Sequence, residues 1–392
     1  MNERKRIIRE AIDAYAPQLK EIAVFIGAHP ELGHEEKLAS AKLADALESL
    51  GYTVERGTLD IPTAFIAEYR SDKPGPIIGL LAEYDALPEI GHACGHHLIC
   101  TMALGAAAGL RTVADGTGGT IRVYGTPAEE TKGAKVDMAN AGLFDDCDVA
   151  LMAHPYHRHE RSGSSLSMDA LQFEFRGKPA HAAANPEQGV NALDAVIQLF
   201  NNIAMLRQQT RSDTRIHGII AEGGQAPNII PDYTMAQFYV RSAARAYTDE
   251  LSRKVKACAE AAALATGCTV EVSNYEYSYD ELRTNHTLAE VYTANLIEEG
   301  ISSDEIFDAE DHGSLDLGNV SLRCPAIHPF IKVVGQPFNL HTVEFRDAAQ
   351  MPPAYDAMVF GAKLLAFTAL EVLTDAELLA RIREEFEAAA SQ

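Results

Sequence analysis

Apolar and polar positions follow a helical period through the first fifty residues. Ile8, Ile12 and Tyr15 recur on one helix face, which predicts an amphipathic helix near the start of the chain. The pattern continues in a second predicted helix, residues 35–50, which ends at Gly51. Glycine is a common helix terminator because it adopts left-handed backbone angles without strain.

The next part of the chain alternates short apolar runs with helical stretches. The runs have the length and composition of buried strands, and an Ala- and Leu-rich helix at residues 98–113 separates the first two. The predicted strands are residues 76–82, 120–124 and 148–153. Strands that alternate with helices indicate a mainly parallel sheet with helices on both faces.

The pattern changes near residue 166. A strand, a helix, two strands, a helix and a last strand are predicted at residues 167–175, 190–209, 215–221, 233–241, 248–266 and 268–277. This β-α-β-β-α-β order is typical of a ferredoxin-like unit. We therefore expect an α/β domain of residues 1–166 and 281–392, interrupted by an inserted α+β domain of residues 167–280.

Charge and composition exclude several classes of function. The 392 residues carry a formal net charge of −23, which opposes binding to nucleic acid or to an anionic membrane because both need a positive face. The N-terminus lacks the apolar core and cleavage site of a secretory signal. No stretch approaches the ~18 uninterrupted apolar residues that a membrane span needs. We expect a cytoplasmic protein that binds neither nucleic acid nor membrane.

Residues with metal-binding side chains follow three of the predicted strands. Each strand leads directly into a polar segment: Glu83 to His97 after the first, Pro127 to Glu130 after the second, and His154-Pro155 after the third. In open α/β sheets, ligands bind outside the carboxyl ends of the strands. If the three strands are neighbours, these side chains converge on one site.

The donor atoms of these segments suit a metal centre. Cys94, His96, His154 and one of the adjacent Glu129 and Glu130 offer a thiolate, imidazoles and a carboxylate, which zinc, or a pair of manganese or cobalt ions, can take as ligands. A thiolate or carboxylate can bridge two ions, and a shared water then becomes the nucleophile. Of two adjacent glutamates, one can bind metal while the other transfers the proton.

Each of these residues also has a purely structural interpretation. A single cysteine usually packs as a small apolar side chain, and the other five cysteines, which form no C-x-x-C pair, are interpreted in that way. Adjacent glutamates are usually solvated, and Asp85 could cap a turn or helix. His92-Ala-Cys-Gly-His96 is a cluster of donors between glycines, however, and that grouping favours a metal site.

The chain resembles the family of two-metal metallopeptidases and amidohydrolases that includes the aminoacylases and carboxypeptidase G. Within that family it is most similar to the branch of hippurate and amino-acid-conjugate hydrolases. The matching stretches are His29-Pro-Glu-Leu32, Asp85-Ala-Leu-Pro88, His92-Ala-Cys-Gly-His96, Pro127-Ala-Glu-Glu130, His154-Pro155, Gly177-Lys-Pro-Ala-His181, Asn228-Ile-Ile-Pro231, Gly313-Ser-Leu-Asp-Leu-Gly318 and His341. They occur in the family's order and cover nearly the whole chain. The specific signal is H-A-C-G-H followed by A-E-E at this separation.

The resemblance implies a role for each matching position. Five residues correspond to the ligands of two divalent metal ions: Cys94, His96, Glu130, His154 and His341. Cys94 corresponds to the bridge and Glu129 to the general acid/base. Apart from the resemblance, the position of Asp85 just after the first predicted strand places it to orient a ligand imidazole. The ions expected are manganese or zinc, with cobalt and nickel as alternatives.

The resemblance also implies a dimer and a substrate. His181 corresponds to a histidine that reaches the partner subunit's active site and stabilises the oxyanion, so the inserted domain would serve as a lid and would make a homodimer. Asn228 and Arg241 correspond to groups that hold the substrate's free carboxylate, and Gly313 and Ser314 to a loop near the scissile bond. The expected reaction is hydrolysis of an amide or peptide bond in an N-acyl amino acid, an aryl-glutamate or a dipeptide.

Two departures from the family pattern bear on the substrate. Most members of the branch carry Asp after the second histidine of the H-A-C-G-H motif, where this chain has His97. His97 together with Glu83-Tyr-Asp85 resembles the pattern of the subgroup of aminobenzoyl-glutamate hydrolases and aminoacylase-like dipeptidases. The pattern does not specify the acyl group of the substrate. Leu315 stands where relatives often have Thr.

Other chemistries fit parts of the pattern. Cys94 could be a covalent nucleophile with His96 or His181 as base, but such an enzyme does not need Glu130, His154 and His341. The same two-metal site could hydrolyse or deaminate a substrate that is not an amino acid, although the H-x-E and P-C-x-x-C signature of zinc deaminases is absent. A non-catalytic relative would tend to lose a ligand or Glu129. The sequence does not separate amidase from dipeptidase, or dimer from tetramer.

Overall fold

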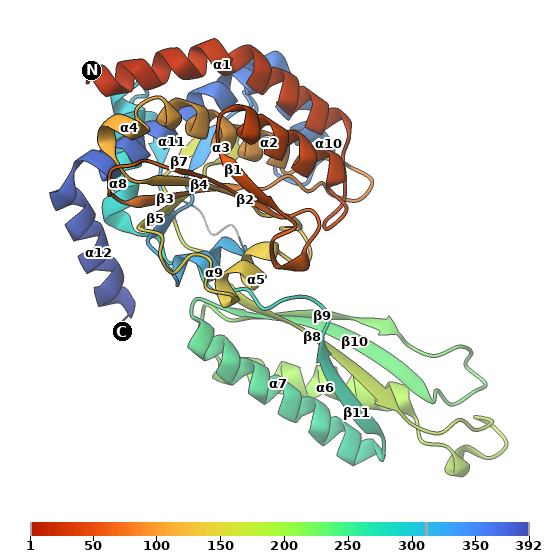
Figure 1. Cartoon of the computed structure of the whole chain (residues 1–392). Helices are drawn as coiled ribbons and strands as arrows, with labels where there is room; N and C mark the ends of the chain where they lie inside the picture. Colours follow the sequence, from red (N-terminus) through yellow and green to blue (C-terminus); the bar gives the residue numbers. More distant parts are fainter. Residues whose placement is uncertain (1, 310–312, 391–392) are drawn as a thin grey trace. The chain divides into compact units, whose positions relative to one another are not determined.

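The computed structural model describes residues 2–309 and 313–390 and divides into two compact units (Figure 1). The larger unit consists of Met1–Ser164, Leu282–His312 and Asp316–Gln392. The smaller unit consists of Ser165–Glu281 and Gly313–Leu315. The fold class expected from the sequence, a mainly parallel α/β domain with an inserted α+β domain, is confirmed.

The larger unit is built on a six-stranded sheet with the order β1-β2-β4-β3-β5-β13. β3 pairs in parallel with β4 and β5, and β5 with β13, whereas β1 and β2 form an antiparallel edge. The strands are β1 (Thr53–Arg56), β2 (Phe65–Arg70), β3 (Ile77–Ala82), β4 (Thr120–Gly125), β5 (Val149–Leu151) and β13 (Ala326–Ile327). β3, β4 and β5 are the three strands predicted from apolar runs, and they are neighbours.

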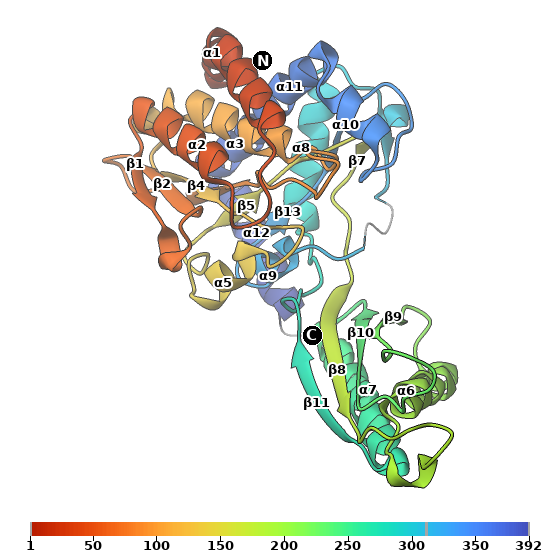
Figure 2. The same cartoon turned by 90° about the vertical axis from the view of Figure 1, so that its right-hand side faces the viewer.

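Helices cover the sheet on both faces (Figures 1 and 2). One face carries α1 (Glu3–Ala28), α2 (Lys37–Ser49), α3 (His96–Arg111) and α11 (Pro352–Thr374). Small residues let these helices approach closely, since a Cβ added to Gly105 of α3 would lie 2.8 Å from the Cβ of Ala362 in α11. Helices α5 (Ala134–Asn140) and α9 (Leu317–Ser321) pack together on the other side.

One helix has the length and composition that a membrane span requires. This helix, α11, contains an apolar window of 18 residues, and 72% of that window is buried inside the structure. α11 packs against α1, α3 and α8 (His286–Glu298). A core helix of a soluble domain has the same length and apolar composition, so α11 is only weak evidence for a membrane-spanning helix.

A second, smaller sheet of the larger unit does not follow from the sequence pattern. Its order is β12-β7-β14-β6. The strands are β6 (His154–Tyr156), β7 (His159–Glu160), β12 (Ile306–Phe307) and β14 (Phe330–Lys332). Strands of two or three residues are too short to show a period, so hydrophobic patterning cannot find them.

The smaller unit has the predicted β-α-β-β-α-β order. Its elements are β8 (Ser167–Arg176), α6 (Ala192–Leu206), β9 (Arg215–Glu222), β10 (Tyr233–Ser242), α7 (Arg245–Thr266) and β11 (Thr269–Asn274). The strands form one antiparallel sheet with the order β11-β8-β10-β9. Buried residues of both helices, among them Leu199 and Leu251, pack with Phe173, Phe175 and Phe238 of the sheet into a separate core.

Candidate active site

The carboxyl ends of three adjacent strands carry the candidate ligands. Asp85 follows β3, Glu129 and Glu130 follow β4, and His154 begins β6 shortly after β5. Because β3 lies between β4 and β5 in parallel register, these ends meet at one edge of the sheet. The convergence expected from strand order therefore occurs.

His96 is the first residue of α3, two residues earlier than the predicted helix start. Gly95 precedes it with φ 84°, a left-handed conformation that glycine adopts without strain. The His96 Nδ1 atom lies 2.9 Å from Asp85 Oδ1 and 3.0 Å from the Asp85 carbonyl oxygen. These contacts fix the ring and direct Nε2 toward the cluster. A carboxylate that holds a histidine in this way is a common partner of metal-binding imidazoles.

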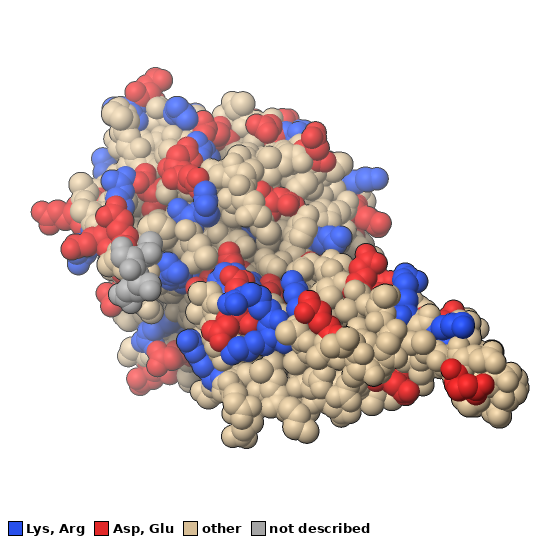
Figure 3. Space-filling model, turned by 90° about the horizontal axis from the view of Figure 1, so that it is seen from below, with Lys and Arg blue, Asp and Glu red and all other residues tan. Residues whose placement is uncertain are grey.

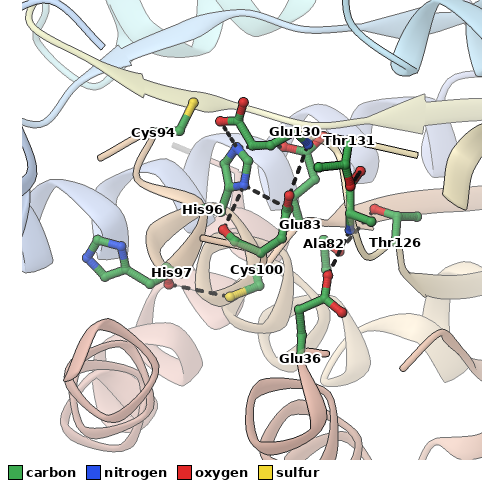
Figure 4. A network of polar contacts seen from close by, with 12 residues as sticks. Glu36, Ala82, Glu83, Cys94, His96, His97, Cys100, Thr126, Glu130 and Thr131 are labelled. Atoms are coloured by element: carbon green, nitrogen blue, oxygen red, sulfur yellow. Dashed lines mark hydrogen bonds and ion pairs between the residues drawn. The ribbon is translucent and has the colours of Figure 1, made fainter. Parts of the chain in front are cut away.

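The Nε2 atom of His96 is buried and has no hydrogen-bond partner among the described residues. Carboxylate oxygens of Glu83 and Glu130 lie 3.6 and 3.9 Å from it. Figure 4 shows His96 and Glu130 pointing toward one another next to Cys94, while His97 points away from them. A buried ring nitrogen surrounded by acidic groups fits a position where a cation binds.

Two groups of donors share Cys94. Donor atoms of Cys94, His96 and His154 lie within 4.8 Å of one another, and so do those of Cys94, Glu130 and His341. The Cys94 Sγ is 3.5 Å from His154 Nε2, and the His341 Nε2 is 3.1 Å from Glu130 Oε1. Five residues thus form two overlapping groups of potential metal donors with one thiol in common.

His341 reaches the cluster from a distant part of the chain. Its φ is 62°, which is uncommon for a residue other than glycine. Its backbone N–H donates to the Ala93 carbonyl, so the loop that carries it is tied to the Cys94 segment. The side chain of His341 is 51% exposed, whereas those of His96 and Glu130 are 1% and 12% exposed. It forms the solvent-facing side of the cluster.

Negative charge is concentrated around Glu129. Donor atoms of Glu129, Glu130 and His96 lie within 4.8 Å of one another. Burial, followed by the charges of Glu130, Glu83 and Asp316, raises the pKa of the Glu129 carboxyl well above its ordinary value. Burial and Glu130 also raise the pKa of the Cys94 thiol. Divalent cations in this cluster would favour the ionised forms of both groups.

A buried ion cluster that the sequence did not reveal lies beside these residues. Lys135 Nζ is 2.6 Å from Glu83 Oε1 and 2.7 Å from Asp316 Oδ1, and all three side chains are at most 2% exposed. Gly133 makes room for this arrangement, because an added Cβ would lie 2.2 Å from Asp316 Oδ2. Glu83 and Asp316 lie in stretches that resemble the family, but Lys135 carried no spacing signal.

His97, one of the two departures from the family pattern, belongs to the core. Its Nε2 is 3.3 Å from the Ala349 carbonyl oxygen, and a Cβ on Gly27 would lie 3.2 Å from its ring. Its ring is also 5.1 Å from that of His92. Burial lowers the pKa of His97 to about 4, so the ring is neutral near pH 7.

The remaining candidate residues lie in the smaller unit. His181 and Ile229 form a β-bridge, and the Ala182 N–H donates to the Asn228 carbonyl, so the His181 and Asn228 segments lie side by side. Both residues are exposed. Arg241, in β10, lies over the ring of Tyr239, with 5.0 Å between the guanidinium carbon and the ring centroid.

Gly313 and Ser314 belong to the same unit as Arg241. A Cβ on Gly313, whose φ is 87°, would lie 3.4 Å from Arg241 Nη1. The Leu166 N–H donates to the Gly313 carbonyl, which fixes this short segment to the start of β8. The smaller unit thus brings together Arg241 with the Gly313 loop, and His181 with the Asn228 loop.

The face of the molecule seen in Figure 3 carries acidic and basic side chains next to one another. The overall balance is strongly negative, with 56 acidic residues against 33 Lys and Arg.

Comparison with known proteins agrees with this architecture. Residues 167–267 match the peptidase dimerisation domain. The chain is 38% identical to the Xaa-Arg dipeptidase of Mus musculus, over 97% of this chain and 92% of the relative. It is 30% identical to one of the p-aminobenzoyl-glutamate hydrolase subunits of Escherichia coli K12, over 98% of this chain and 95% of the relative.

Solved structures share the fold. An aminobenzoyl-glutamate utilization protein from Klebsiella pneumoniae superimposes with a TM-score of 0.71 at 19% identity, covering 91% of this chain and 97% of that one. A dinuclear metal-binding peptidase of the M20 family from Bacillus subtilis gives 0.68 at 20% identity, covering 92% and 99%.

The fold and the relatives define a hydrolase of the peptidase and amidohydrolase class. The chain belongs to the M20 family, in the branch that contains Xaa-Arg dipeptidase and aminobenzoyl-glutamate hydrolase.

Proposed function

We propose that this hydrolase uses two divalent metal ions to cleave a peptide or amide bond next to a free carboxylate. The observation that carries the proposal is the pair of donor groups that share Cys94 beside Glu129. The five donors fit the ions, since thiolate, imidazole and carboxylate together suit zinc or manganese, with cobalt and nickel as alternatives. When bound, the ions would supply Lewis acidity to the amide carbonyl and to the attacking water.

In this proposal Glu129 moves the proton. It accepts a proton from the attacking water and delivers it to the leaving nitrogen, the usual division between a metal-binding glutamate and its neighbour. Asp85 holds His96 in place through Nδ1 and also accepts a hydrogen bond from the Glu130 N–H at 3.0 Å. One carboxylate therefore orients two of the five proposed ligands.

The smaller unit would supply recognition and assembly. Arg241 would hold the substrate's carboxylate, with Gly313 and Ser314 lining the loop near the scissile bond. Asn228 lies beside His181 at the other end of β10, so it would join this carboxylate only from the partner subunit. His181 would stabilise the oxyanion in the partner subunit's site. The match of residues 167–267 to a peptidase dimerisation domain supports a homodimer.

The proposed substrate is a dipeptide, with Xaa-Arg dipeptides first. The support is the 38% identity to Xaa-Arg dipeptidase over 97% of the chain. An aryl-glutamate is the second candidate, because a chain 30% identical to this one over nearly its full length is part of a p-aminobenzoyl-glutamate hydrolase. Both substrates present an amide bond next to a free carboxylate, so the same residues can position either one.

The test is amide hydrolysis by the metal-reconstituted protein on Xaa-Arg and other dipeptides, N-acyl amino acids and aryl-glutamates, with and without a chelator. Chelator-sensitive release of a free amino acid is the expected result. Two bound metals per chain without activity on any substrate would place the substrate outside amino-acid conjugates. Activity that resists chelators and is lost on thiol alkylation would instead favour Cys94 as a nucleophile.

A further inference from the structure

We propose that Glu36, buried in the loop of residues 29–36, is a positioning residue that fixes the turn carrying Glu129 and Glu130. The proposal rests on the function proposed above. This loop contains the stretch His29-Pro-Glu-Leu32, which resembles the family but which the mechanism leaves without a role.

Glu36 is attached to the turn directly. Its side chain is fully buried, and its Oε1 accepts a hydrogen bond of 2.8 Å from the Ala128 N–H. Figure 4 shows the Glu36 side chain extending from just before α2 toward the segment that contains Thr126 and Thr131. Ala128 has φ 67°, a left-handed conformation that alanine seldom adopts. An unusual backbone conformation persists only where its surroundings hold it.

Two further contacts join the loop to the same turn. The Nε2 of His34 lies 2.9 Å from the Lys132 carbonyl oxygen. Gly33 lies directly on the turn, because an added Cβ would be 2.9 Å from the Ala128 Cβ and 2.6 Å from Thr131 Oγ1. The loop thus contacts the turn before the two glutamates, at Ala128, and after them, at Thr131 and Lys132.

The loop is itself held by other parts of the site. The Ala86 N–H donates to the Glu31 carbonyl oxygen, which ties the loop to the residue after Asp85. The Glu31 carboxylate accepts from the N–H groups of Leu38 and Ala39 in the first turn of α2. The helix start, the Asp85 segment and the glutamate turn are therefore connected through this one loop.

This arrangement connects Glu36 to the reaction through Ala128. The direction of the Glu129 side chain is set by the backbone that Ala128 begins, and a base displaced by about 1 Å can lose about 100-fold in rate. Loss of the Glu36 acceptor would leave the Ala128 N–H buried without a partner and release the strained conformation. The other proposed metal ligands lie on other segments, and Asp85 holds Glu130 separately by accepting from its N–H at 3.0 Å, so all five should keep their positions.

The experiment compares Glu36→Leu with Glu36→Gln, and uses Glu35→Gln as control because the neighbouring Glu35 is exposed. Metal content, kcat and KM are measured on the best dipeptide substrate. We expect Glu36→Leu to lower kcat about 30-fold or more, with KM within about threefold and metal content unchanged. Glu36→Gln keeps a carbonyl acceptor and should restore kcat to within about threefold.

A purely structural role predicts a different result. Loss of kcat in Glu36→Leu that parallels loss of metal or of folded protein, or no recovery in Glu36→Gln, would overturn the proposal. If Glu36→Leu does not fold, Gly33→Ala displaces the same turn with the carboxylate in place, and an unchanged kcat there would also overturn it. A wild-type protein that holds two metals but cleaves none of the substrates rejects the proposed function, and this inference falls with it. An active wild type with an unaffected Glu36→Leu rejects the positioning role alone.

Discussion

The two units hold their candidate residues in opposite ways. In the larger unit, buried side chains from separate segments share hydrogen bonds, and Asp85 alone contacts both His96 and the backbone of Glu130. In the smaller unit, His181 and Asn228 lie in exposed segments, and Arg241 is half-buried against Tyr239.

This difference separates chemistry from recognition. When one buried residue that shares hydrogen bonds with its neighbours is replaced, a charge or polar atom of a neighbour is left unpaired. The replacement therefore disturbs the other residues of the network as well. Exposed groups on a separate core can change with little effect on metal binding. Substitutions of the proposed metal ligands in the larger unit should therefore alter metal content and kcat, whereas substitution of Arg241 in the smaller unit should alter KM without loss of metal.

The largest effect is expected for His154→Ala. Its ring belongs to the donor group of Cys94 and His96, so its loss should remove metal and lower turnover at least about 1,000-fold, the worth of several kcal/mol of Lewis acidity. Metal content by elemental analysis and initial rates check this. His286→Ala, exposed at the start of α8, is the control. Full metal content in His154→Ala would remove His154 from the ligand set.

Glu36 also makes stability depend on pH. Burial, outweighing backbone hydrogen bonds, raises the pKa of Glu36 to about 7. The unfolded carboxyl has its ordinary pKa near 4.5, so between these values the folded state binds more protons and stability falls as pH rises. From pH 5 to pH 8, the free energy of unfolding of the wild type should fall by about 2.5 kcal/mol more than that of Glu36→Gln. Urea unfolding followed by circular dichroism measures the free energy of unfolding of both proteins at each pH. The same pH dependence in the two proteins would contradict a raised pKa of Glu36.

A smaller effect is expected for Asp85→Asn. The substitution changes the group that holds His96 Nδ1, and such second-layer changes typically cost 10–100-fold in metal affinity. Titration with a competing chelator measures the affinity, and Asp137→Asn in α5 serves as control. An unchanged metal affinity would mean that the contact between Asp85 and His96 Nδ1 does not affect metal binding by His96.

The smallest effect tests the other unit. Arg241→Ala should raise KM about tenfold and leave metal content unchanged, because a charge-assisted hydrogen bond contributes about 1.5–3 kcal/mol. Arg215→Ala removes the guanidinium directly opposite in β9 and is the matched control. If Arg241→Ala lowered metal content, the separation between the two units would be wrong.

The sequence predicts the parts of this molecule that depend on local pattern. The strands β3 and β4 have short, mainly apolar runs, and their ends carry motifs whose spacing indicates a metal site. The apolar pattern predicts that α3 starts at Leu98, because the polar His96 and His97 do not belong to the apolar repeat. In the structure the left-handed conformation of Gly95 ends the preceding loop, and the helix begins directly after it at His96.

What the sequence could not predict depends on contacts between distant segments. Lys135 and Asp316 are 181 positions apart, yet they form a buried pair. Glu36 and Ala128 are 92 positions apart. Neither contact follows from a hydrophobic repeat or a sequence motif. A charged side chain is buried beside a partner only when folding brings the two distant segments together.

The most direct test of the central claim is Glu129→Gln, which keeps the shape of the side chain but cannot accept the proton. Metal content and turnover are measured on the same preparation. The proposed mechanism predicts unchanged metal content and turnover lower by about 100- to 10,000-fold. A Glu129→Gln protein that keeps most of its turnover would contradict Glu129 as the general base.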